Sequence, residues 1–402
     1  WYQNVRRICN DYTKNALEEI GIAEEEFDKY FLKLENSKVE NMDFSVEDKL
    51  FVENFIKKTK GVKSERTRKI LEIQREWTEQ LKKCDEVELY IIKSTVIIAG
   101  TCTGFVSNRI IRDVEFDYVI VDEAAKATFP ELAVSLNKAH KIILVGDHQQ
   151  LPPVLDTEII RNNKEKLDEE GLAQGIFERM YNMFPEDNKH RLTIQYRMHP
   201  TIGTLISHVF YNDEIQNGVE AQDRELCIEG YEGIAIEWIS TSKYSTKERY
   251  EKEFDNNGKK SYQNYLERNI IERKLLELDS KLVKRTKVAV ITGYGSQKYI
   301  LQTMVKQHSF KHIEVDVDTV DAFQGSQKDI ILYSTVRSSG NKYGIGFLKS
   351  EARINVAFSR ARCLLIIVGD MKFLDNYKIR GNKFPEIIKY ITESEGCRII
   401  EK

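Results

Sequence analysis

The sequence predicts an α/β protein with two parallel-sheet blocks and a helical arm in front of them. The arm is predicted because residues 1–95 are dense in Glu, Lys, Leu and Ile and contain only two glycines. From residue 95 onward, short apolar runs are separated by helical stretches, which is typical of parallel sheets. The alternation resumes after a polar, irregular stretch at residues 212–262, so we expect two blocks.

The arm is predicted to consist of long helices, because Ile70, Ile73, Trp77 and Leu81 recur at helical spacing and form one apolar stripe. Residues 1–95 could therefore form an antiparallel pair of helices. A charge-rich arm of this kind is usually a solvated scaffold, and contact with a protein partner is the alternative.

Three strands are predicted in the first block, at Thr95–Ala99, Phe116–Val121 and Lys141–Val145. Each run is short and apolar, and small or polar residues follow it. Ligands bind at the carboxyl ends of the strands in parallel sheets. We therefore expect a ligand site near the residues that follow these runs, which are Gly100–Gly104, Asp122-Glu123 and Gly146-Asp147.

The second block is predicted to contain strands at Thr286–Thr292, Lys328–Val336 and Cys363–Val368 and helices at Ser296–Lys306 and Glu351–Arg360. Its alternation of strand and helix is like that of the first block. The two blocks could be two copies of one fold, which the sequence alone does not decide.

The composition narrows the class of protein. Of the 402 residues, 41% are hydrophobic and 31% are charged, which allows a sizeable core and long solvated helices. The net charge of −3 argues against a histone-like protein, although a local basic stripe could still bind nucleic acid. No apolar run is long enough to span a bilayer, so we expect no membrane partner. The six cysteines form no C-x-x-C pair, which argues against zinc and predicts thiols in a reducing, cytoplasmic compartment.

Two adjacent acids, Asp122 and Glu123, follow the predicted strand Phe116–Val121. Hydrolysis of a phosphoanhydride needs one carboxylate to hold Mg²⁺ and another to orient water. Neighbouring residues on a strand point in opposite directions, so the turn has to begin at Asp122 if both acids serve one site. The pair by itself could also be a strand end with two solvated acids.

The segment after the next strand is more specific, and reads Gly146-Asp147-His148-Gln149-Gln150-Leu151-Pro152-Pro153. The glycine permits a tight exit from the strand, and the two prolines stiffen the loop. A rigid loop with an amide at its base can sense a phosphate. An ordinary turn is the alternative, but the order of eight specified residues, one strand after an acid pair, argues against it.

With these motifs the chain resembles the superfamily 1 DNA/RNA helicases of the group that includes the nonsense-mediated-decay helicase and senataxin. The resemblance covers roughly residues 95–370, and the motifs follow the family's order. Gly293 stands where the family has a proline. Five further stretches carry the resemblance: Thr101–Gly104, Gln195–Pro200 (Q-Y-R-M-H-P), Val290–Tyr294, Thr319–Gly325 and Asn355–Arg362.

The resemblance implies two RecA-like parallel-sheet motor domains with an N-terminal helical arm. Residues 1–95 would then be a stalk inserted into the first motor domain, residues 96–188 the C-terminal part of that domain, and residues 189–402 the second motor domain. The implied activity is that of an ATP-dependent helicase or translocase on single-stranded DNA or RNA that moves 5′ to 3′, with ATP and Mg²⁺ as cofactors.

The resemblance also implies roles in ATP hydrolysis. Asp122 would help to hold Mg²⁺, Glu123 would activate the attacking water, and Gln150 would read the γ-phosphate. Arg197 and Arg360 would reach across from the second motor domain and neutralise charge as the γ-phosphate leaves. The planar, permanently charged guanidinium suits this task. A surface salt bridge is the alternative for either arginine.

Further residues are implied in binding. Tyr196 would stack near the adenine, and Gly325 and Gln327 would lie near the ribose. The family usually has Glu at the position of Gln327, so the nucleotide preference is open. The candidates for contact with the nucleic-acid backbone are Thr101, Pro152, Thr319 and Arg337; contacts of that kind give affinity without reading sequence.

One family element is missing. No G-x-x-x-x-G-K-[ST] occurs in the 402 residues, although this loop cradles the β- and γ-phosphates. In the family it lies upstream of the motifs found here, and the first residue is Trp1. We therefore expect a preceding segment to carry it, and this chain alone to bind ATP poorly and be inactive.

Two other hypotheses stay open. The chain could be a non-catalytic module that binds nucleic acid or protein and has lost turnover; a phosphate loop before Trp1 in the full gene product would argue against it. The other is a metal-dependent nuclease that uses Asp122 and Glu123, although no third acid and partner lysine occur at a fitting spacing. Mn²⁺-dependent cutting without ATP would favour the nuclease.

Overall fold

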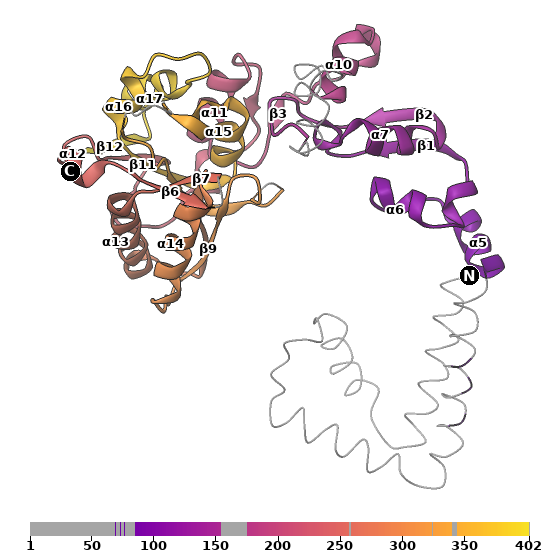
Figure 1. Ribbon diagram of the computed structural model, residues 1–402, viewed down its shortest axis with the longest axis horizontal. Coiled ribbons are helices and arrows are strands. Elements are labelled where there is room, and N and C mark those ends of the chain that lie inside the picture. Colours follow the sequence, from indigo (N-terminus) through magenta and orange to yellow (C-terminus); the bar gives the residue numbers. More distant parts are fainter. Residues whose placement is uncertain are drawn as a thin grey trace. The chain divides into compact units, whose positions relative to one another are not determined.

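The computed structural model of the protein describes residues 69, 73, 76, 85–153, 175–256, 259–323, 325–339 and 344–401 (Figure 1). The chain divides into two compact units, residues 1–114 and 115–402. Most of the predicted helical arm, including Ile70, Trp77 and Leu81, lies outside the described residues. The domain boundaries after residues 95 and 188 stay a prediction.

The described part of the first unit is helical. The strand predicted at residues 95–99 is wrong, because this segment is irregular and Val96 is 97% exposed. A strand needs a partner for its backbone N–H and C=O groups, and the described residues of this unit include no strand. Its elements are α5 (Asp85–Ser94), α6 (Cys102–Ser107) and the 3-10 turn η2 (Ile111–Asp113).

A small parallel sheet opens the second unit. Both strands predicted here are confirmed, and the second begins slightly earlier than expected. The helix between them begins at a capping box, in which the side chains of Thr128 and Glu131 satisfy its first backbone N–H groups. The elements are β1 (Phe116–Val121), η3 (Ala124–Lys126), α7 (Phe129–Leu136), β2 (Ala139–Leu144), and further along the chain α10 (Ile176–Met183) and η4 (Glu186–Asn188).

A six-stranded sheet forms the larger part of the second unit, and all its neighbouring strands are parallel. The strand predicted at residues 286–292 matches β8 at both ends, and those predicted at 328–336 and 363–368 correspond to β10 and β11. The order across the sheet is β12 (Cys397–Glu401), β5 (Ile236–Ser240), β11 (Ala361–Gly369), β10 (Lys328–Ser334), β8 (Thr286–Thr292) and β9 (Ile313–Thr319).

Helices cover both faces of this sheet (Figure 1). Residues that alternate along the strands enter two separate buried clusters. The first cluster, under α11, α15 and α17, contains Trp238 and Phe384, whose rings meet edge to face at 6.0 Å. The second cluster lies under α13 and α14. The predicted α/β class with a parallel sheet is therefore confirmed. The helices are α11 (Pro200–Phe210), α13 (Tyr265–Lys281), α14 (Gly295–Lys306), η6 (Gly346–Lys349), α15 (Glu351–Phe358), α16 (Met371–Asn376) and α17 (Phe384–Glu393).

The region 212–262 was predicted to be irregular, but it contains the fully buried strand β5. It also contains an antiparallel hairpin, which lies between β5 and α13 in the sequence. Among the described residues, no helix is both long enough and apolar enough to cross a membrane. The remaining elements are β3 (Ile194–Gln195), β4 (Gln216–Asn217), η5 (Ala221–Arg224), α12 (Thr246–Arg249), β6 (Lys252–Asn256) and β7 (Lys259–Gln263).

Candidate active site

The two adjacent acids lie where the chain leaves β1. Asp122 accepts a hydrogen bond from the backbone N–H of Glu123 (2.9 Å), and Glu123 is in the left-handed conformation, with φ of 54°. The N–H of Ala124 then donates to the carbonyl oxygen of Val145 (2.8 Å). The turn therefore begins at Asp122, as two acids that serve one site require. Both acidic side chains are exposed.

The loop after β2 is built around Asp147. Its carboxylate accepts hydrogen bonds from the backbone N–H of Gln149 (2.9 Å) and from the side-chain amide of Gln150 (2.8 Å). Gly146 is required here by close packing, because a Cβ at this position would lie 2.8 Å from the backbone nitrogen of Ala125. The loop thus orients the amide of Gln150.

The far end of this loop is anchored against the six-stranded sheet. Leu151 is 5% exposed and belongs to the buried cluster under α11 and α15. Asn355, on α15, donates its side-chain amide to the carbonyl oxygen of Gln149 (3.0 Å). The loop that follows β2 is therefore in contact with α15 and with the core of the larger sheet.

Arg197 lies in a tightly held loop between β3 and α11. The side-chain oxygen of Gln195 accepts a hydrogen bond from the N–H of Arg197 (2.9 Å). Arg224 donates to the carbonyl oxygens of Tyr196 (2.8 Å) and Arg197 (2.9 Å). Burial lowers the pKa of Arg197, and the negative charge of Glu123 acts against this. The loop therefore holds Arg197 within the field of Glu123.

Arg360 follows α15 and is 3% exposed. Its guanidinium donates to the side-chain oxygen of Gln150 (3.4 Å) and to the carbonyl oxygen of Val356 (3.0 Å). Burial, and then the like charge of Arg197, lower the pKa of Arg360 to about 10, while Glu123 acts in the opposite direction. A buried guanidinium and a half-buried one that interact with each other are stabilised by an anion, so this place suits a phosphate group.

Tyr211 follows α11 and joins this site, although none of the sequence motifs contains it. Its hydroxyl donates to the carboxylate of Asp147 (2.5 Å) and accepts from the side-chain amide of Asn355 (2.9 Å). Burial raises the pKa of Tyr211, and the charge of Asp147 adds to the effect. Asn355 lies in a recognised motif, but the sequence reasoning gave it no role. No sequence signal marked Tyr211, because its partners lie far away along the chain.

Comparison with known proteins shows which family the chain belongs to. Models of the AAA domain family match residues 3–158 and 172–372. The "Regulator of nonsense transcripts 1 homolog" of Drosophila melanogaster is 35% identical over 301 residues, which are 73% of this chain and 24% of that protein. The "ATP-dependent helicase NAM7" of Saccharomyces cerevisiae is 33% identical over 324 residues, 79% of this chain and 31% of that protein. The chain belongs to the superfamily 1 helicases of the nonsense-mediated-decay type.

The chain thus spans about a quarter to a third of the length of these two relatives. An archaeal relative, the "Uncharacterized ATP-dependent helicase MJ0104" of Methanocaldococcus jannaschii, is 29% identical over 358 residues, 85% of this chain and 48% of that protein. Among solved structures, that of the PRRSV helicase matches 62% of this chain and 34% of its own, at 17% identity and a TM-score of 0.30. This last likeness is too low to add to the fold described above.

Three residues are expected to bind nucleotide. Tyr196 is next to Arg197 in the sequence, and Gly325 and Gln327 lie in a turn near Arg360. Tyr196, which precedes Arg197, packs its ring against Gly218 and is still 63% exposed, which leaves surface for stacking. Gly325 and Gln327 are exposed in the turn between β9 and β10. Directly after this turn, the N–H of Lys328 donates to the carbonyl oxygen of Arg360 (3.1 Å). The roles of Tyr196, Gly325 and Gln327 stay predictions.

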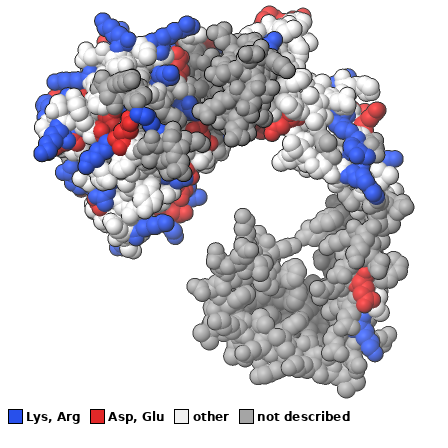
Figure 2. All heavy atoms as spheres, viewed as in Figure 1, with Lys and Arg blue, Asp and Glu red and all other residues white. Residues whose placement is uncertain are grey.

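The helicase residues expected to touch nucleic acid are spread over both units. Thr101 is in the first unit, where its side chain caps α6 by accepting from the N–H of Gly104 (3.0 Å). In the second unit Pro152 is exposed, and Thr319 is half-buried at the carboxyl end of β9. On the face that Figure 2 shows, the described Lys and Arg side chains of the second unit lie among Asp and Glu rather than in one stripe. The contacts of these three residues stay predictions.

The predicted nucleic-acid contact of Arg337 is contradicted by its burial. The side chain is 0% exposed and forms an ion pair with Glu251 (3.2 Å). Its guanidinium lies 4.0 Å from the centre of the Tyr262 ring, a cation–π arrangement. A side chain without exposed surface cannot reach a nucleic-acid strand in this conformation, so Arg337 is structural here.

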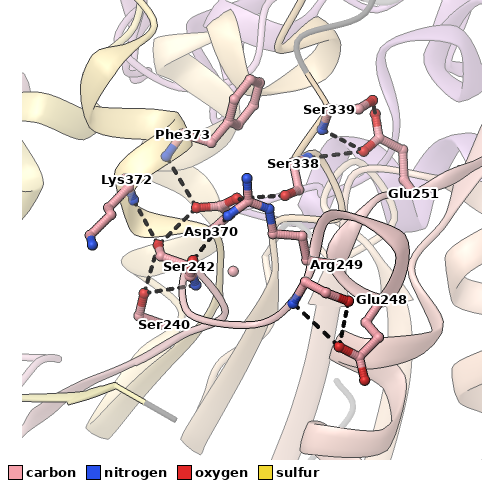
Figure 3. Close-up of polar contacts among 12 residues, drawn as sticks. Ser240, Ser242, Glu248, Arg249, Glu251, Ser338, Ser339, Asp370, Lys372 and Phe373 are labelled. Carbon is pink, nitrogen blue, oxygen red and sulfur yellow. Dashed lines mark hydrogen bonds and ion pairs between the residues drawn. The ribbon is translucent and has the colours of Figure 1, made fainter.

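Buried acids also hold the segment directly after Arg337; Figure 3 shows Glu251 and Asp370 bound to Ser338 and Ser339. The backbone N–H groups of Ser338 (3.0 Å) and Ser339 (2.9 Å) donate to Glu251. The hydroxyl of Ser338 donates to Asp370 (2.6 Å), which also pairs with Arg249 (3.4 Å). The segment that follows β10 is therefore fastened both to the segment that follows α12 and to the end of β11.

The residues present fit the γ-phosphate end of ATP and a Mg²⁺ ion. The half-buried guanidinium of Arg197 and the buried one of Arg360 favour an anion beside them. Asp122 offers an exposed carboxylate at the end of β1, and Mg²⁺ is usually bound by one or two carboxylates together with substrate phosphates.

Proposed function

We propose that the protein is an ATP-dependent helicase or translocase that acts on single-stranded DNA or RNA. The observation that carries the proposal is the hydrogen bond from Arg360 to Gln150 (3.4 Å), in a place where the charge of Glu123 acts on Arg360 and on Arg197. The family and the name of the yeast relative, an ATP-dependent helicase, support the same activity.

Each residue has its own task in the proposed hydrolysis. Glu123 orients the attacking water and accepts its proton, and Gln150 senses the γ-phosphate. Arg197 and Arg360 neutralise the charge that develops on the phosphate oxygens, which is the main source of catalysis in phosphoryl transfer. Asp122 would hold the Mg²⁺ that accompanies ATP. Closure of the two sheet blocks on ATP, and opening after hydrolysis, would move the protein along a strand.

Finer parts of the proposal rest on family membership and on the sequence. Movement from 5′ to 3′ and a preceding segment that carries the phosphate loop follow from the family. We infer a cytoplasmic location from the lack of a C-x-x-C pair in the sequence. We infer a protein partner for residues 1–95 from their charge-rich sequence, which is predicted to be helical.

A non-catalytic module that binds single-stranded nucleic acid is the second candidate. A G-x-x-x-x-G-K-[ST] in the full gene product, the loop that supplies backbone N–H groups and a lysine to the phosphates, would argue against it. Such a module would bind nucleic acid without turnover.

ATPase assays on the full-length gene product, with single-stranded DNA and RNA compared side by side, test the proposal. We expect hydrolysis that nucleic acid stimulates, and the better stimulator identifies the track. The variant Glu123→Gln should abolish stimulated hydrolysis and leave ATP binding intact, because only the acceptor of the water proton is lost. Hydrolysis that persists unchanged would show that Glu123 is not the base.

The variant Arg360→Ala should slow turnover about a thousand-fold, the scale found for arginine fingers. Arg353→Ala is a matched control, because Arg353 is on α15, the helix that precedes Arg360, but pairs with Asp321 at the surface (3.2 Å); its turnover should stay within a few-fold. A loss of only a few-fold in Arg360→Ala would remove the finger role. Nucleic-acid binding without any hydrolysis in the wild type would favour the non-catalytic module.

A further inference from the structure

The hydroxyl of Tyr211 lies at the centre of a directed chain of hydrogen bonds. It has one proton, which it donates to the carboxylate of Asp147 (2.5 Å). It accepts a hydrogen bond from the side-chain amide of Asn355 (2.9 Å). A short hydrogen bond to a carboxylate is stronger than one between neutral groups, so the contact between Tyr211 and Asp147 is the strong link of this chain.

The same carboxylate orients the proposed phosphate sensor. The side-chain amide of Gln150 donates to Asp147 (2.8 Å). That donation leaves the side-chain oxygen of Gln150 free to accept from Arg360 (3.4 Å). The orientation of Gln150 toward Arg360 therefore depends on the carboxylate of Asp147, and the same carboxylate oxygen (Oδ2) accepts the hydrogen bond from Tyr211.

Asn355 lies on α15 and Tyr211 directly follows α11, both packed on the six-stranded sheet, whereas Asp147 and Gln150 follow β2. The hydroxyl of Tyr211 consequently ties the sensor loop to the part of the chain that supplies Arg360. Asn355 reinforces this tie, because its amide also donates to the carbonyl oxygen of Gln149 (3.0 Å). A group in this position can set both the orientation of the sensor and its distance from the arginine.

We propose that Tyr211 is a positioning residue for hydrolysis, which acts through Asp147 to align Gln150 with Arg360. The inference rests on the proposed ATPase function and adds to it a residue outside the family motifs found in the sequence. Besides its contact with Asp147, the hydroxyl of Tyr211 also forms a side-chain hydrogen bond with Gln150 itself, and both contacts orient the sensor. Loss of the hydroxyl should therefore lower the rate of the chemical step and leave the binding of ATP unchanged.

The variant Tyr211→Phe removes only this hydroxyl and keeps the ring. In the full-length gene product we expect kcat to fall roughly ten- to hundred-fold, the range that corresponds to one hydrogen bond to a charged group, while KM for ATP stays within about two-fold. The matched control is Tyr390→Phe. Tyr390 is half-buried on α17, and its hydroxyl donates to the carbonyl oxygen of Thr201 (3.1 Å); its kcat should not change.

A second measurement separates positioning from a general loss of structure. If the hydroxyl acts through the carboxylate, the double variant Tyr211→Phe with Asp147→Asn should be no slower than Asp147→Asn alone. Losses of kcat that multiply in the double variant would overturn the positioning role. An equal fall of kcat in Tyr211→Phe and in Tyr390→Phe would also overturn it.

The outcome for the wild type distinguishes this inference from the proposed function. A full-length wild type without ATPase activity would overturn the proposed function, and the positioning role with it. A wild type that hydrolyses ATP, with a Tyr211→Phe variant that keeps its full kcat, would overturn the positioning role alone.

Discussion

Glu267 should make the stability of this protein depend on pH. The side chain is fully buried near the start of α13 and accepts hydrogen bonds from the hydroxyls of Ser334 (2.6 Å) and Thr335 (3.1 Å). It also accepts from the N–H of Val336 (2.9 Å). Val336 is a β-branched residue in the left-handed region, with φ of 68°, which is an unfavourable conformation. Glu267 therefore supports a strained turn directly before Arg337.

Burial raises the pKa of Glu267 to about 8 from an ordinary value of 4.5, although its three hydrogen bonds act in the opposite direction. Between these two values the folded protein keeps a proton that the unfolded chain has lost. The stabilising contribution of this proton is complete below the ordinary pKa and disappears as the pH rises toward about 8. The slope for one proton is about 1.4 kcal/mol per pH unit, or about 3 kcal/mol between about pH 5.5 and 7.5.

Urea unfolding of the wild type and of Glu267→Gln over this pH range measures the effect. The amide cannot ionise, so the free energy of unfolding of the variant should lack the fall of about 1.4 kcal/mol per pH unit, whatever other groups titrate in both proteins. Glu393→Gln, at an exposed position of α17, should keep the slope of the wild type. Equal slopes for the wild type and Glu267→Gln would refute the assignment of a buried, protonated carboxyl.

Two further predictions concern packing and buried charge. Gly293→Ala should lower the free energy of unfolding by about 1–3 kcal/mol, because the new Cβ would lie 2.3 Å from Cδ1 of Phe347; thermal unfolding measures it, and a loss that persists in a Phe347→Ala background would contradict the clash. Glu237→Gln should cost about 3 kcal/mol in urea unfolding, because Lys274, 6% exposed, then keeps only the more exposed Glu277 (2.8 Å) of its two carboxylates, and Arg398 loses its ion pair with Glu237. Glu314→Gln breaks only an exposed pair and should cost less than about 1 kcal/mol; equal losses in these two Glu→Gln variants would show that the buried charge is not costly.

The strands of the sheet centre could be predicted because they are buried on both faces. Such strands appear as continuous apolar runs in the sequence, and β8, β10 and β11 have this pattern. The strand β5 was missed because Glu237 interrupts its apolar run. The buried charge of Glu237 is neutralised by ion pairs with Lys274 on α13 and Arg398 on β12. No local pattern in the sequence indicates these partners.

The candidate site was predicted in part. Gln150 and Arg360 were expected in one place from the family resemblance, and they hydrogen-bond to each other. The placement of Arg337 was wrong, since a motif position does not reveal whether a guanidinium faces solvent or a buried carboxylate. Tyr211 was missed because a single tyrosine after a helix has no pattern of its own.

The sequence by itself determined the class of fold, the helicase family and the residue types available for phosphate chemistry, because strand periodicity and motif order are local properties of the chain. Only the tertiary structure decided which charges are buried and what they face. It brings Tyr211 to Asp147 and encloses Arg337 against Glu251. Burial and the identity of distant partners depend on how the helices pack over the sheets, and such contacts leave no mark in the order of neighbouring residues.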